Sequence, residues 1–257
     1  MRRIKATVWV LAFLFLALVF GGCGGLFGPK AIVFTCPNLE QAIRNAAGYT
    51  GQATGPIYPQ DVAGIVILNV SNPAPSSTCA IGEEHDQKGQ PRTVITSLEG
   101  IQHLINLLSL SLDNNQVSNL SPLRNLTQLQ QLWFNGNQVS SLSPLQNLVN
   151  LNRIDCSYNQ ISNLTPLQNL TNLARLGLAN NVINDLGPLT NLTNLQILDL
   201  RHNFVINAGP LVQNTGFGPG DEIDLRWNLL NFTNPVVIAQ ISELNSRGVT
   251  VYVNPQK

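Results

Sequence analysis

The densest group of side chains able to bind a metal is the run Glu83–Asp86, "EEHD". Carboxylate and imidazole groups suit several divalent metals, but a site needs enough ligands to complete a coordination sphere. The run lies in a polar stretch with no second histidine or carboxylate cluster nearby. We therefore interpret it as a solvated loop and predict neither a metal site nor a cofactor.

Catalytic motifs are equally scarce in this sequence. The three histidines, His85, His103 and His202, are not spaced as in HExxH, and no GxSxG run is present. The glycine-rich run at Gly216–Gly220 lacks the GK[ST] sequence that follows in a phosphate-binding loop. We therefore predict that the chain is not an enzyme.

The four cysteines are too widely spaced for a zinc motif. Cys36 and Cys79 lie in segments before the repeats described below, and they are a candidate disulfide in an oxidising compartment. Cys156 occupies a repeat core position, where a free cysteine acts as a small hydrophobic residue. The spacing leaves the pairing of Cys36 with Cys79 open.

The N-terminus has the pattern of an export signal. Arg2, Arg3 and Lys5 precede an apolar run at 7–20, which is short for a membrane span of about 20 residues. Gly21, Gly22 and Cys23 follow, and this sequence resembles the lipobox of bacterial lipoproteins, although Phe20 stands where that family usually has Leu.

This resemblance implies a signal peptide at 1–22, lipidation of Cys23 and a lipidated linker at 23–35. The chain would then be held in the cell envelope, at the outer membrane or cell surface, through its lipid. An ordinary cleaved signal, which gives a secreted protein, and an uncleaved anchor are the alternatives. All three interpretations place the protein outside the cytoplasm.

Charge is low and balanced across the chain. The formal net charge is zero and only 11% of residues are charged. Nucleic-acid binding needs a clustered basic face, and beyond the first five residues no such cluster is present. We therefore exclude nucleic acid as a partner and expect a monomer with a protein ligand that the sequence does not identify.

A regular repeat dominates the second half of the chain. The frame LxxLxLxxNxΦxxLxPLxxL, in which Φ is aliphatic, recurs every 22 residues, and a sixth, partial copy follows a three-residue insertion within "TGFGPGD". The asparagines that mark the copies are Asn115, Asn137, Asn159, Asn181, Asn203 and Asn228.

The frame predicts stacked coils that share one core. In LxL two side chains point inward from a short strand while their neighbours point outward, and proline keeps the return segment out of a regular helix. One coil cannot bury its leucines alone, so successive coils must stack and form a parallel sheet. We expect the buried asparagine amides to satisfy backbone groups at the turn after each strand.

These copies resemble the leucine-rich repeat family, in the 22-residue class found in internalins and in a phosphatase regulator. The resemblance covers residues 95–233. It implies an α/β solenoid, a leucine-rich repeat horseshoe with a parallel β-sheet on its concave face.

The flanking segments are expected to cap this solenoid. An amphipathic helix containing Leu39 and Ile43 precedes a degenerate first strand near Leu68. After the repeats, Asn234 and Pro235 begin a second helix, and a strand at 249–253 follows it.

Both ends resemble the caps of bacterial leucine-rich repeat lipoproteins and other secreted repeat proteins. The expected organisation is an N-terminal cap at 36–93 with a polar insertion at 71–91, repeats at 94–233, and a helix–strand C-terminal cap at 234–257.

Residues on the concave face are set by no requirement of the scaffold. Several are of the Trp, Tyr and Arg types that dominate interface energetics. We expect the aromatic side chains to be exposed and the arginines to form the edge of one column, although they could instead pair with aspartates across strands. The candidate binding residues are Trp133, Arg153, Asp155, Tyr158, Arg175, Asp199, Arg201, His202, Asp224, Arg226 and Trp227.

The sequence thus favours an exported, membrane-anchored protein that binds another protein through its concave face. A structural, envelope-associated protein without a specific concave-face ligand is the alternative. The fold alone does not decide between them.

Overall fold

The computed structural model describes residues 30–49, 55–71 and 94–254. The described residues from Ala31 onward belong to one compact unit. The predicted signal peptide, Cys23, Cys79, the run Glu83–Asp86 and nearly all of the polar insertion lie outside the described residues.

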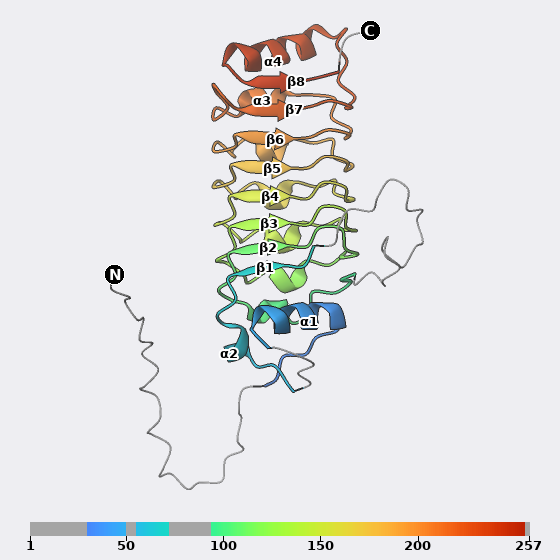
Figure 1. Ribbon diagram of the computed structural model, residues 1–257. Coiled ribbons are helices and arrows are strands. Elements are labelled where there is room, and N and C mark those ends of the chain that lie inside the picture. Colours follow the sequence, from blue (N-terminus) through green and yellow to red (C-terminus); the bar gives the residue numbers. More distant parts are fainter. Residues whose placement is uncertain (1–29, 50–54, 72–93, 255–257) are drawn as a thin grey trace, which may run out of the picture. The chain divides into compact units, whose positions relative to one another are not determined.

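The solenoid carries one sheet of eight parallel strands in chain order (Figure 1). Adjacent strands pair in register, so Leu110 lies beside Leu132 and Leu132 beside Ile154. The strands are β1 (Ile67–Asn69), β2 (Ser109–Ser111), β3 (Gln131–Trp133), β4 (Arg153–Asp155), β5 (Arg175–Gly177), β6 (Ile197–Asp199), β7 (Glu222–Asp224) and β8 (Thr250–Tyr252).

Short helices form the return segments on the other side of the coils (Figure 1). Most are single 3₁₀ turns that begin with the Ser-Pro, Thr-Pro or Gly-Pro pair of the repeat frame, because proline fits the first turn but disrupts a longer helix. They are η1 (Ile101–His103), η2 (Ser121–Leu123), η3 (Ser143–Leu145), η4 (Thr165–Leu167) and η5 (Gly187–Leu189), and α3 (Gly209–Gln213) takes the same place in the next coil.

A continuous hydrophobic core runs between the sheet and the return segments. Leu110, Leu132 and Leu176, from the middle of three strands, are almost completely buried. Phe134 and Cys156 occupy equivalent core positions and are also inaccessible, and burial raises the pKa of the Cys156 thiol well above its ordinary value. Each buried aliphatic side chain contributes roughly 1.5–3 kcal/mol, so stacking of the coils stabilises the fold.

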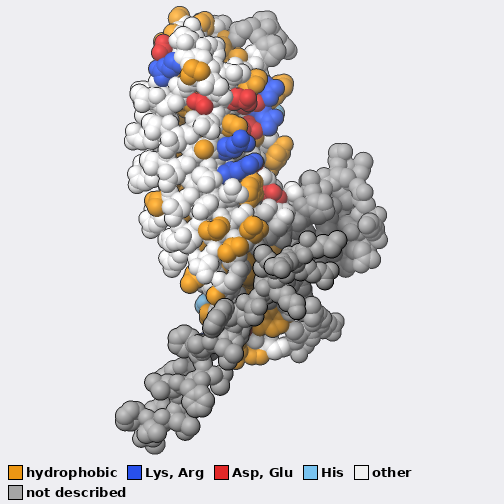
Figure 2. All heavy atoms as spheres, turned by 60° about the vertical axis from the view of Figure 1, so that its left-hand side comes forward, with side chains coloured by type: hydrophobic (Ala, Val, Ile, Leu, Met, Phe, Trp, Pro, Cys, Tyr) orange, Lys and Arg blue, Asp and Glu red, His pale blue; other side chains and the backbone are white. Residues whose placement is uncertain are grey.

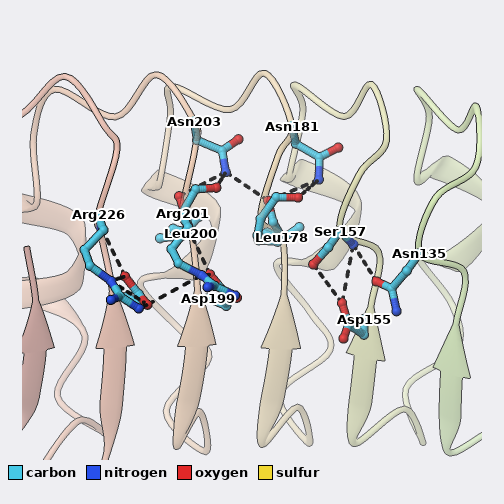
Figure 3. A network of polar contacts seen from close by, with 12 residues as sticks. Asn135, Asp155, Ser157, Leu178, Asn181, Asp199, Leu200, Arg201, Asn203 and Arg226 are labelled. Atoms are coloured by element: carbon cyan, nitrogen blue, oxygen red, sulfur yellow. Dashed lines mark hydrogen bonds and ion pairs between the residues drawn. The ribbon is translucent and has the colours of Figure 1, made fainter. Parts of the chain in front are cut away.

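The repeat asparagines form a ladder of hydrogen bonds between coils (Figure 3). Asn203 donates from Nδ2 to the carbonyl of Leu178 in the preceding coil (2.9 Å) and to that of Leu200 in its own coil (3.0 Å). Its Oδ1 accepts from the backbone N–H of Ile183 (3.0 Å). The other five repeat asparagines make the same set of bonds, so each amide joins two coils.

Helices lie at both ends of the described solenoid. At the N-terminal end α1 (Pro37–Ala46) buries Leu39 and Ile43, and a four-residue helix, α2 (Pro59–Val62), which the sequence pattern did not predict, follows it. At the C-terminal end α4 (Pro235–Ser246) begins at Asn234, whose Oδ1 accepts from the N–H of Val236 (2.9 Å). In the described part of the chain, no helix combines the length and hydrophobicity needed to cross a membrane.

Candidate binding face

The outward side chains of the strands and of the turns that follow them form the surface that we call the sheet face. It consists of the first and third residues of each strand and the two residues before each ladder asparagine. Figure 2 shows charged side chains gathered on one side of the molecule with hydrophobic side chains between them, whereas the neighbouring surface is almost free of charge.

Two Asp-x-Arg turns at the C-terminal end of the sheet face form an ion-pair network (Figure 3). Arg201 lies 2.7 Å from Asp199, and Arg226 lies 2.6 Å from Asp224. Arg201 is also 3.5 Å from Asp224, so the network links two coils. The hydrogen bonds that the Arg201 guanidinium donates to Asp199 raise its pKa. The described arrangement holds both guanidinium groups in place while leaving them partly exposed.

The expectation of a single arginine column was wrong. Arg153 and Arg175 are the first residues of β4 and β5 and lie side by side, whereas Arg201 and Arg226 come two residues after the third position of their strands. The aspartates of β6 and β7 therefore lie between these two positions within each coil. For Arg201 and Arg226 the alternative of pairing with aspartates is the correct one.

Trp133 also differs from the expectation of an exposed aromatic side chain. It is only partly accessible, because the guanidinium of Arg153 on the next strand lies over its ring, 5.4 Å from the centroid. The Trp133 ring therefore already makes a cation–π contact with Arg153 within the chain.

A chain of side-chain oxygens crosses the N-terminal half of the sheet face. Oδ1 of Asp113 accepts from the N–H of Asn135 (2.8 Å), and Oδ1 of Asn135 accepts from the N–H of Ser157 (2.8 Å). The Ser157 hydroxyl in turn donates to Asp155 (2.9 Å). Burial raises the pKa of Asp113, and the charge of Asp155 raises it further. These polar side chains are engaged with the backbone of adjacent coils.

The residue before each ladder asparagine has a left-handed backbone in six successive coils. Asn114, Gly136 and Asn180 occupy this position in three coils, as expected from their tolerance of positive φ. In the other three coils the position holds Tyr158 (φ 57°), His202 (φ 52°) and Trp227 (φ 62°).

Two of these bulky side chains are open to solvent. Tyr158 is 64% exposed and Trp227 is 60% exposed. His202 is exposed as well, and its ring is stacked on that of Trp227. Burial in the core therefore does not explain why aromatic residues occupy a left-handed position.

Exposed apolar residues that the sequence analysis did not select lie just beyond the ladder. The residue after the ladder asparagine is Gln116, Gln138 or Gln160 in three coils, and the next three coils have an apolar residue there. Aligning the six copies by this position would have revealed the change. The apolar residues are Val182, Phe204 and Leu229, and all three are exposed.

Tyr252 on β8 is a further residue that the sequence analysis did not select. Its ring lies 5.5 Å from the guanidinium of Arg226 and it is partly exposed. It extends the aromatic and arginine character of the sheet face to the last strand.

Cys36, one half of the candidate disulfide, is free and buried at the start of α1. Burial opposes its ionisation, but hydrogen bonds from backbone groups, that of Thr96 foremost, outweigh this effect and lower the pKa of the thiol. Its proposed partner Cys79 lies outside the described residues.

Among the described residues, no three His, Cys, Asp or Glu side chains gather so that they could hold a metal ion.

A polar pocket of about 370 Å³ lies away from the sheet face, between η2 and η3. Its lining is mostly hydroxyl and amide side chains, with Arg124 as the charged member. The polar lining residues include Ser118, Asn119, Ser121, Asn125, Ser141, Ser143, Gln146 and Asn147.

Comparisons with known proteins agree with this geometry. A family model described as leucine-rich repeats in two copies matches residues 127–169. No curated protein matches the chain.

Two solved structures of internalins from Listeria monocytogenes are similar to the chain. An internalin (inlF) is 26% identical with a TM-score of 0.70 over 88% of this chain, which spans 58% of that protein's length. Internalin C2 is 28% identical with a TM-score of 0.60 over 90% of this chain and 100% of its own. Together, the repeat frame, the parallel sheet and these similarities identify the chain as an internalin-like leucine-rich repeat protein.

Proposed function

We propose that the chain is an exported protein, anchored in the cell envelope by a lipid on Cys23, that binds another protein through the sheet face. The single observation that carries this proposal is the exposure of Tyr158 and Trp227 on a surface where the scaffold needs neither. Tyr, Trp and Arg are enriched among the residues that dominate binding energy in protein interfaces. The stacked coils provide a rigid support for them.

The anchoring part of the proposal rests on the N-terminal sequence. The positive start, the short apolar run and Cys23 support export and lipidation rather than a membrane span. A lipid at this position would display the solenoid at the envelope.

A crosslinking pull-down tests the binding part of the proposal. The bait is residues 24–257, presented to envelope and culture-medium proteins beside a Trp133→Ala/Tyr158→Ala/Trp227→Ala variant whose folding is checked by circular dichroism. A partner captured by the parent and lost from the variant supports binding through the sheet face. Equal capture by both, or capture by neither, contradicts it.

The polar pocket between η2 and η3 supports a second candidate, an envelope-associated structural role. Hydroxyl and amide side chains with one guanidinium suit the hydroxyl and acidic groups of a cell-wall polymer. Under this alternative, Arg124→Ala lowers retention of the protein in the cell-wall fraction, and the triple sheet-face variant does not. The opposite result favours the sheet face.

A further inference from the structure

We infer that partner binding is concentrated in one patch near the C-terminal end of the solenoid, where the sheet face borders the exposed apolar residues that follow the ladder asparagines. We infer further that this patch recognises an uncharged, apolar segment of another protein. This inference rests on the proposed function and specifies its site and ligand class. The patch, called here the C-terminal patch, consists of Val182, His202, Phe204, Ile206, Trp227 and Leu229.

His202 and Trp227 both have a left-handed backbone. A side chain with a Cβ is sterically disfavoured at positive φ, and asparagine or glycine serves the same position in Asn114, Gly136 and Asn180. The scaffold therefore works with small residues at this position. Bulky residues held in a disfavoured conformation without burial point to a role outside folding.

The residue just after the ladder asparagine changes from glutamine to an apolar type in the last three coils. The N–H groups of Gln160 and Phe204 make the same bond, to the carbonyls of Val139 and Ile183 in the preceding coils. The backbone is therefore equivalent, and only the side chains differ.

These apolar side chains are substantially open to solvent. Phe204 is 49% exposed, Leu229 is 57% exposed, and Ile206, two residues after Phe204, is 62% exposed. Folding alone would be served as well by glutamine, as in the earlier coils. A group of exposed apolar residues bordered by polar ones is typical of a protein interaction site.

The balance of charge around the patch favours one kind of occupant. The charged groups beside the patch are Asp199, Asp224, Arg201 and Arg226, in which two guanidinium groups balance two carboxylates at 2.6–3.5 Å. A charged partner would have to compete with these existing ion pairs. An uncharged apolar segment can instead cover Phe204, Trp227 and Leu229 without disturbing them, so charge complementarity favours a neutral partner.

A displayed library of random 12-residue peptides provides a defined probe for this inference. The full chain, solubilised in detergent and immobilised, is used for selection. The selected peptides are then measured one by one against three proteins: the parent, the variant Val182→Gln/Phe204→Gln/Leu229→Gln, and the variant Trp133→Ala/Arg153→Ala. The first variant carries the residue that the earlier coils have at the same position, so it should fold, which its melting curve checks.

The expected result is enrichment of aliphatic and aromatic peptides of low net charge. Their affinity should fall about tenfold or more in the glutamine variant and change little in the Trp133/Arg153 variant. Selection of charged peptides, or of none, overturns the inference, as does binding that the glutamine variant retains.

Two outcomes separate this inference from the proposed function. Binding lost only in the Trp133/Arg153 variant overturns the C-terminal patch but leaves binding through the sheet face intact. Binding unchanged in both variants counts against the C-terminal patch and against the proposed function. Sedimentation of the parent and the glutamine variant provides the last check. Self-association of the parent alone would mean that a second copy of the chain occupies the patch, which also overturns the inference.

Discussion

The imidazole ring of His202 stacks on the indole ring of Trp227, with centroids 5.5 Å apart and planes inclined by 10°. The two residues occupy the same position in successive coils, and both have a left-handed backbone. The stack therefore joins two coils through residue types that are disfavoured by the left-handed backbone of the turn. This conflict between local backbone preference and surface chemistry leads to the first prediction.

Tyr158→Asn should stabilise the fold. Asparagine tolerates the left-handed conformation that costs other L-residues about 1–2 kcal/mol, and little buried area is lost because Tyr158 is mostly exposed. We expect the free energy of unfolding in urea to rise by up to about 1 kcal/mol. The converse substitution Asn180→Tyr should lower it, and a destabilised Tyr158→Asn variant would show that the ring supports the fold.

Asn181→Ala should destabilise the solenoid strongly. The change leaves the buried N–H of Ile161 without its acceptor. It also removes one of two donors to each of the carbonyls of Cys156 and Leu178, which keep their bonds from Asn159 and Asn203. One unsatisfied buried group costs about 1–3 kcal/mol, so we expect a loss of about that size in urea unfolding. The exposed neighbour Asn184 is the control, because its change to alanine should alter stability by less than about 0.5 kcal/mol. Equal effects at the two positions would contradict the role of the ladder.

Asp113→Asn should raise stability at neutral pH and reduce its dependence on pH. Burial raises the pKa of Asp113 above its ordinary value of 3.8, so folding favours the protonated carboxyl. Its contribution to stability is present below that ordinary value and is lost as the pH rises through the folded-state pKa. Asparagine keeps the acceptor, as Asn135 does for Ser157 in the next coil, and carries no charge.

Urea unfolding of parent and Asp113→Asn between about pH 3 and pH 7 measures this effect. The advantage of the variant should appear as the pH rises and should vanish at the acidic end. An advantage that is constant across the range would rule out the titration of Asp113 as its cause.

Cys23→Ala should abolish lipidation and release the protein from membranes. The proposed thioether-linked lipid needs the Cys23 sulfur, which alanine lacks. Metabolic labelling with a fatty-acid analogue followed by fractionation measures both effects, with Cys156→Ala as the matched cysteine control. Absence of label from the parent would leave an ordinary signal peptide or an uncleaved anchor as the explanation of the N-terminal sequence, whereas label that persists in Cys23→Ala would place the lipid on another residue.

The sequence by itself determined the architecture, because a constant spacing of 22 residues places the same residue types at equivalent positions of every coil. Leu110, Leu132 and Leu176 must then meet in one core, and Asn137 and Asn159 must follow one another in a ladder. The helix that begins at Asn234 was also predictable from its cap residues. The short helix α2 was not, because four residues carry too little periodicity to distinguish a helical turn from a loop.

The chemistry of the sheet face was decided by the tertiary structure. The four arginines belong to two different positions, and Arg153 covers Trp133, because these contacts depend on distances between side chains of neighbouring coils. The left-handed backbone at Tyr158, His202 and Trp227 likewise arises from the turn that the stacked coils impose. Residue spacing along a chain specifies which positions are equivalent, whereas the contacts between side chains and the backbone angle at a turn exist only once the coils are packed together.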